Sequence, residues 1–158
     1  MEKIYDIQGY NIINEDIDYD SLWVGKVLLN DNGTIEGVST DGVTYKLHLI
    51  KGKLTKNYIE LYNFSYNDQE VCKRFNCIKK KNVYDGSYNA TDSFTSVQIG
   101  ECTLKVIPAD KTREVSTAEI ISLKEKIELL KSHLGKEGEK IYSNIDTPQV
   151  NNLTKKIK

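Results

Sequence analysis

Apolar and polar side chains alternate along most of the first 108 residues, which is the pattern of half-buried β-strands. The clearest case is residues 43–51, where Tyr45, Leu47 and Leu49 share one face and polar residues occupy the other. The same alternation, with varying regularity, recurs in seven further segments. We therefore expect strands near residues 3–13, 21–29, 33–39, 43–51, 53–65, 70–80, 83–89 and 94–107.

Residues that favour turns separate these segments. They are Asp31-Asn32-Gly33, Asp41-Gly42, Lys51-Gly52, Tyr66-Asn67-Asp68, Lys81-Asn82 and Thr91-Asp92. Connections this short make neighbouring strands antiparallel, and a change of parity in the last strand predicts a β-bulge at Gly100-Glu101. Because seven or eight sequential strands must protect their edges, we predict a mainly β fold, an antiparallel up-and-down barrel of seven to eight strands with a C-terminal α-helical extension.

Two acidic or amide-rich stretches resemble calcium-binding loops but lack several of the required ligands. In NDNGTIEG, placing Gly33 at loop position 6 puts Leu28 and Ser39 at positions 1 and 12, where carboxylates are needed. In NEDIDYDS, Asp16 at position 1 places Ser21 at the glycine position. We therefore expect no metal site, interpret the first stretch as a hairpin turn, and interpret residues 14–20 as the first turn of a short helix.

The order of these parts resembles the lipocalin and avidin-like barrels, the calycins. A short acidic lead-in precedes Leu22-Trp23-Val24-Gly25, and a meander of hairpins and a helix follow, so the resemblance covers roughly residues 14–135. The family places its glycine before the tryptophan, whereas here the glycine follows it. The resemblance implies an internal pocket for a small, mostly apolar ligand. We expect Trp23, Tyr45, Leu47 and Leu49 to line it.

A helix is predicted after Pro108. Ser116-Thr117-Ala118-Glu119 is a capping box, and Gly135 is a natural stop. Between them, apolar residues at alternating spacings of 3 and 4 form a coiled-coil-like stripe. Its residues are Ile120, Leu123, Ile127, Leu130 and Leu134.

The sequence allows two packing partners for this stripe. The helix packs on its own barrel, or it binds a protein partner or another copy. Lys124 and Lys131 flank the stripe and would face lysines in a symmetric coiled coil, so that form of self-pairing is disfavoured. The predicted organisation is a barrel over 1–110, an amphipathic helix over 111–135, and a polar linker with a short terminal helix over 136–158, the last beginning near Thr147-Pro148.

A basic segment over residues 73–81 raises single-stranded nucleic acid or nucleotide binding as an alternative. Its cations are Lys73, Arg74, Lys79, Lys80 and Lys81, and Tyr84 and Tyr88 would supply rings for stacking. The formal net charge of -1 gives no general attraction to nucleic acid.

Candidate chemistry is sparse. The chain has 2 histidines and 3 cysteines without metal-ligand spacing, and no motif of a catalytic nucleophile or phosphate loop. Because the N-terminus lacks a signal-peptide pattern, we expect a cytoplasmic protein with reduced cysteines. The sequence favours a non-catalytic binding module without cofactors, which docks a protein partner or its own copies through the barrel surface and helix. A calycin-like ligand carrier and a nucleic-acid binder are the alternatives.

Overall fold

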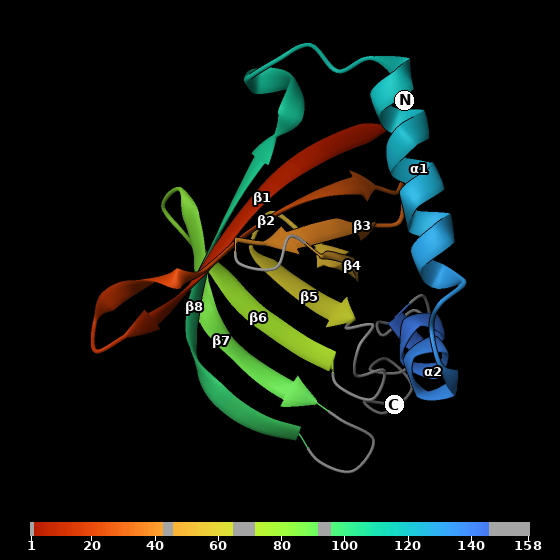
Figure 1. The fold of residues 1–158 in the computed structure, drawn as a ribbon. Coiled ribbons are helices and arrows are strands. Elements are labelled where there is room, and N and C mark those ends of the chain that lie inside the picture. The colour runs from red at the N-terminus through yellow and green to blue at the C-terminus, as the bar shows by residue number, and fades with distance from the viewer. Residues whose placement is uncertain (1, 43–45, 65–71, 92–95, 146–158) are drawn as a thin grey trace, which may run out of the picture.

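The computed structural model describes residues 2–42, 46–64, 72–91 and 96–145, and within them eight strands form a closed antiparallel barrel in sequence order (Figure 1). The predicted fold class is confirmed. The strands are β1 (Lys3–Ile13), β2 (Asp16–Leu29), β3 (Thr34–Asp41), β4 (Leu47–Leu54), β5 (Tyr58–Phe64), β6 (Cys72–Lys80), β7 (Val83–Thr91) and β8 (Ser96–Pro108).

The barrel interior is filled by side chains from every strand. Trp23 on β2 and Phe75 on β6 lie on strands that are not sheet neighbours, yet their ring centroids are 5.5 Å apart, so these side chains meet across the barrel. Tyr88 on β7 extends the contact, at 6.0 Å from Phe75. Ile50, Ile59 and other aliphatic residues that belong to the same cluster are fully buried.

A second apolar cluster lies outside the barrel, beneath the helices. After β8 come a 3-10 turn η1 (Ala109–Lys111), α1 (Thr117–Lys131) and α2 (Lys136–Ile145). Figure 1 shows both helices on one side of the barrel, and α1 contacts β3 and β4. Leu49 and Phe64, from the outer face, pack there with Leu123, Ile127 and Tyr142.

The capping box before α1 is confirmed in its first half. The side chain of Ser116 accepts a hydrogen bond from the backbone N–H of Glu119 at 3.2 Å. The Glu119 carboxylate instead accepts hydrogen bonds from Arg113 and Lys26, as described below. The predicted polar linker after Gly135 was wrong for residues 136–145, which form α2, because Ile141, Tyr142 and Ile145 recur at helical spacing and pack on the barrel. The helix predicted at Thr147-Pro148 lies outside the described residues.

The helical interpretation of residues 14–20 was also wrong. Asn14 and Glu15 have φ of 51° and 70° and form a two-residue hairpin turn between β1 and β2. Beyond it, Gly9 pairs with Trp23 but Asn11 pairs with Asp18, so four β2 residues bulge opposite Tyr10. This bulge lets the hairpin, seen in red to orange in Figure 1, project away from the barrel wall.

Side chains of the hairpin itself hold the bulge together. Asp18 accepts a hydrogen bond from the backbone N–H of Asp20, and the Ser21 hydroxyl donates to the Asp18 carbonyl and accepts from the Asn11 N–H. The aspartates whose spacing resembles a calcium loop therefore lie on a bent strand. The Asp18 carboxylate accepts a hydrogen bond from the nearby backbone instead of binding a metal ion.

The turns predicted at Asp31-Asn32-Gly33 and Lys81-Asn82 are confirmed, and Gly42 also lies in a turn. The turns predicted at Tyr66-Asn67-Asp68 and Thr91-Asp92 lie wholly or partly outside the described residues. At Asn32-Gly33, Gly33 has φ of 86° and the Asn32 side chain accepts from the Thr34 N–H. Lys51-Gly52 was wrong as a turn, because both residues lie inside β4. A Cβ on Gly52 would lie 1.8 Å from the Glu60 carbonyl oxygen, so glycine there permits close approach of neighbouring strands. The bulge predicted at Gly100-Glu101 occurs just before Gly100, where the β7–β8 register shifts.

Candidate functional site

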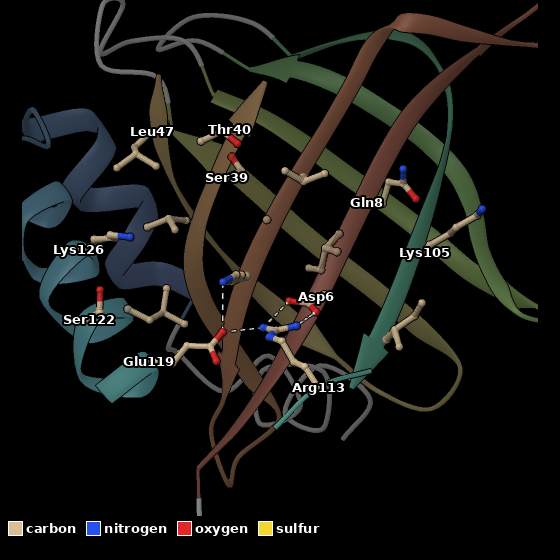
Figure 2. A pocket seen from close by; sticks show the side chains of 17 residues that line it. Asp6, Gln8, Ser39, Thr40, Leu47, Lys105, Arg113, Glu119, Ser122 and Lys126 are labelled. Atoms are coloured by element: carbon tan, nitrogen blue, oxygen red, sulfur yellow. Dashed lines mark hydrogen bonds and ion pairs between the residues drawn. The ribbon is translucent and has the colours of Figure 1, made fainter. Parts of the chain in front are cut away.

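A groove lies between α1 and the outer face of the barrel (Figure 2). Its volume is about 740 Å³, within the range of ligand-binding sites. The groove exists because α1 packs mainly on β3 and β4, which leaves Val24 on β2 and Ile107 on β8 exposed beside the helix. Strand alternation points every second side chain of these strands into it.

The floor of the groove is partly apolar. Val24 on β2 is 50% exposed and Ile107 on β8 is also exposed, and Leu47, Val38 and Leu123 form the wall toward α1. Exposed β-branched side chains on a concave surface are unfavourable in water unless something covers them. The groove therefore has the apolar character of a binding surface.

The rim of the groove is cationic. Four cationic side chains and two carboxylates line it, which sums to a formal charge of +2. In Figure 2, Lys126 enters from α1 and Lys105 stands on the opposite side, on β8. Neither lysine forms an ion pair with the residues that the structure describes. Both are free to meet an anionic group.

An ion-pair network occupies one end of the groove. The Arg113 guanidinium binds Asp6 through both Nη atoms, and its Nη2 donates to Glu119 Oε1 at 2.6 Å. Lys26 Nζ lies 3.2 Å from the same Glu119 oxygen. These bonds connect β1, β2 and the segment before α1 to the first turn of α1, so they position the helix against the barrel.

The same contacts set the pKa values of the network. The hydrogen bond from Arg113, then Lys26, lowers the pKa of the Glu119 carboxyl, although partial burial opposes this. Hydrogen bonds to Asp6 and Glu119 raise the pKa of the Arg113 guanidinium. The Glu119 carboxylate and the Arg113 guanidinium therefore stay charged at neutral pH, and we assign the network a positioning role rather than a catalytic one.

The expected internal pocket is not assembled as the sequence suggested. Trp23 lies inside the barrel, whereas Leu47 and Leu49 lie on the outer face, in or beside the cluster beneath the helices. Tyr45 lies outside the described residues. Trp23 Nε1 is a buried donor without a hydrogen-bond partner among the described residues.

The stripe on α1 packs on its own barrel. Leu123, Ile127 and Leu130 are buried there, and Ile120 and Leu134 are partly buried against the same cluster. Its flanking lysines are also engaged within the chain. Lys124 pairs with Glu2 at 2.5 Å, and Lys131 lies near Glu128 and over the Tyr142 ring. The sequence allowed the stripe to pack on its own barrel or on another chain, and in the structure it packs on its own barrel.

The basic segment over residues 73–81 follows β6 and the turn after it. Arg74 pairs with Glu60 at 3.0 Å, and Lys73, Lys79, Lys80 and Lys81 are exposed. Tyr84 and Tyr88, expected to stack on bases, are buried in the barrel core, so their ring faces do not meet solvent. Burial raises the pKa of both phenols.

One open end of the barrel forms a second cavity of about 500 Å³. Inward-facing residues Tyr5, Leu29 and Val106 line its apolar part. Three lysines surround it: Lys56, Lys79 and Lys111. Its lining therefore combines an apolar base with cationic side chains, as the groove does.

The described residues hold no group of three or more His, Cys, Asp or Glu side chains arranged for a metal ion. Within the same residues, no helix is long and apolar enough to cross a membrane. Cys77 and Cys102 are buried as free thiols with their sulfurs 3.5 Å apart. The hydrogen bond between them and burial raise the pKa of the Cys77 thiol, which keeps it protonated and unreactive.

Sequence reasoning missed the groove because its residues carry no motif. Its lining comes from β8, β1, β2, β3, β4, α1 and the segment before α1, which only the closed barrel brings together. The sequence signal that could have found it is the presence of apolar residues, Val24 and Ile107, at strand positions that alternate with the inward-facing ones and lie close to lysines. Comparison of the chain with models of known families, with curated proteins and with solved structures found no match.

Proposed function

We propose that this protein is a non-catalytic interaction module whose binding site is the groove between α1 and β8, β1 and β2. The occupant is a segment of a protein that carries apolar side chains beside carboxylates. The observation that supports this most is that one concavity holds the exposed Val24 and Ile107 together with Lys105 and Lys126, which form no ion pair with any described residue.

Each half of the groove contributes differently to binding. Covering the apolar floor removes it from water and supplies most of the affinity, at roughly 25 cal/mol per Å² of apolar surface. The lysines orient the partner and raise its association rate, and salt weakens their effect. The Arg113 network fixes the groove wall in advance, which reduces the ordering needed on binding.

The test uses 8-anilinonaphthalene-1-sulfonate, which joins apolar rings to one negative charge. We expect saturable fluorescence enhancement with the full-length protein and a loss of at least ~10-fold in affinity for the variant Val24→Glu/Lys126→Glu, because the variant charges the floor and reverses the rim. The matched control is Ile78→Glu, an exposed isoleucine on β6 away from the groove. Unchanged binding by the groove variant would reject the proposal.

A second candidate function rests on the cavity at the barrel end. The eight-stranded up-and-down barrel is compatible with a calycin-like fold, and a carrier of a small anionic, partly apolar molecule would use Tyr5, Leu29 and Val106 beneath Lys111. The same dye separates the candidates. If Lys111→Glu removes binding and the groove variant does not, the carrier function is favoured.

A further inference from the structure

The β1–β2 hairpin is an exposed arm, defined here as residues 11–20. Ile13 is 55% exposed, Tyr19 is 75% exposed and Ile17 is also exposed. The arm carries four carboxylates within six residues, at Glu15, Asp16, Asp18 and Asp20. Apolar side chains exposed on a projecting element usually mark an interaction surface.

The arm also has an unpaired strand edge. Pairing between β2 and β3 begins at Trp23, so among the described residues the arm part of β2 pairs only with β1. Such an edge is a hazard for uncontrolled association unless it is covered or guarded by charge. The carboxylates of the arm guard it against most partners and direct it toward a cationic one.

Arm and groove are complementary in chemistry. The arm presents isoleucines and a tyrosine beside four negative charges, and the groove presents an apolar floor beside a formal charge of +2. We propose that the occupant of the groove is the arm of a second copy of this chain. This inference rests on the proposed function of the groove and names its partner.

The positions of arm and groove allow a closed dimer. The groove reaches Gln8 on β1 and Val24 on β2, which pair with each other, and the arm begins just beyond the next pair, Gly9 and Trp23. Arm and groove are thus consecutive along the same two strands. Two copies related by a two-fold axis and running in opposite directions place each arm on the other copy's groove, which satisfies both sites without an open-ended chain.

The mode of self-association differs from the coiled coil that the α1 stripe suggested. The stripe is buried on its own barrel, so it is not available for pairing. An arm-to-groove contact joins unlike surfaces and therefore avoids the lysine-to-lysine repulsion of a symmetric helix pair. The net charge of -1 per copy opposes association only weakly.

The mass of the full-length protein in solution tests the inference. Light scattering after size exclusion is expected to give twice the 18.0 kDa of the chain, with a midpoint that moves to higher protein concentration as salt increases. The arm variant Ile13→Lys/Asp16→Lys is expected to raise the dissociation constant at least ~10-fold, since it removes an apolar contact and reverses a charge. Both residues are exposed and lie outside the hydrogen bonds of the bulge.

A mixing experiment distinguishes arm-to-groove pairing from any other dimer. The arm variant keeps its groove, and Val24→Glu/Lys126→Glu keeps its arm, so each alone is expected to be monomeric while their mixture forms a heterodimer with one intact contact. Native mass spectrometry resolves the three species. The control Ile78→Lys is expected to stay dimeric. A monomeric wild-type protein, a dimer unaffected by the arm variant, or failure of the mixture to associate overturns the inference.

The dye separates this failure from failure of the proposed function. If the groove is occupied by the arm, the arm variant binds 8-anilinonaphthalene-1-sulfonate more tightly than the wild-type protein does. A monomeric wild-type protein that still binds the dye in its groove overturns the second-copy occupant and leaves the groove as a binding site. Loss of dye binding from both proteins rejects the two together.

Discussion

At the scale of single residues, the barrel interior depends on a fit between Gly9 and Trp23. The two residues are cross-strand partners on β1 and β2, and the Trp23 indole extends over Gly9 toward Phe75. A Cβ on Gly9 would lie 2.3 Å from Trp23 Cε2, far inside van der Waals contact. The indole is wedged by Phe75 and cannot move away freely, so the absence of a side chain at residue 9 is a packing requirement.

We therefore expect Gly9→Ala to lower the free energy of unfolding by about 1–3 kcal/mol, the usual penalty of overpacking. Urea unfolding followed by Trp23 fluorescence measures it. The matched control is Gly42→Ala, where the new Cβ would meet the Leu22 carbonyl oxygen at 3.4 Å, an ordinary contact. Equal stability of the two variants would contradict the fit described here.

At the scale of elements, α1 carries apolar side chains on two faces, one packed on the barrel and one exposed to solvent. Ile127 is 2% exposed, beneath the helix against the barrel, whereas Ile121 is 51% exposed on the far side. The heptad-like spacing placed Ile127 in the stripe but did not say what the stripe would cover. Its burial by β3 and β4 makes α1 part of the folded unit.

Replacing each isoleucine by alanine separates these roles. Ile127→Ala is expected to lower the free energy of unfolding by about 2–5 kcal/mol, because it leaves a cavity beneath the helix. Ile121→Ala is expected to stay within about 0.5 kcal/mol of the wild-type protein, as surface changes usually do. Thermal or urea unfolding of the two variants measures both. A small effect of Ile127→Ala would mean that the stripe does not pack on the barrel in solution.

At the scale of the whole molecule, two separate apolar clusters support the fold. One fills the closed barrel, and the other lies between the outer face and the helices. Among the described residues, the strand ladder and the interior cluster involve none after Pro108, so the barrel contains its own core. The helices cover residues of the outer face, including Leu49 and Phe64, that would otherwise meet water.

Truncation after Val115 is expected to preserve the barrel and expose its outer apolar cluster. Circular dichroism should keep its strand signal, the melting temperature should fall, and the truncated protein should bind 8-anilinonaphthalene-1-sulfonate strongly and associate. Full-length protein under the same conditions is the control. Loss of the strand signal on truncation would show that the helices are needed to form the barrel itself.

Much of the barrel could be predicted from local patterns. Period-2 alternation located all eight strands. The turn predicted at Asn32-Gly33 and the helix cap predicted at Ser116 are both present in the structure. The misses arose where tertiary contacts override local preference. Residues 16–18 form a strand because β1 pairs with them, and Gly52 lies within a strand because a neighbouring backbone approaches it closely.

The sequence by itself determined the order of the strands, their antiparallel pairing and the helix that begins after Ser116. Only the tertiary structure decided which strand face is inside. On β4, Leu49 points outward beneath the helices, while its neighbour Ile50 joins the interior cluster. Alternation shows that the two faces of a strand differ in polarity. It does not show which face lines the barrel interior when helices bury part of the outer face as well. The groove follows from this orientation of the strands, since it lies at the edge of the outer surface that α1 covers.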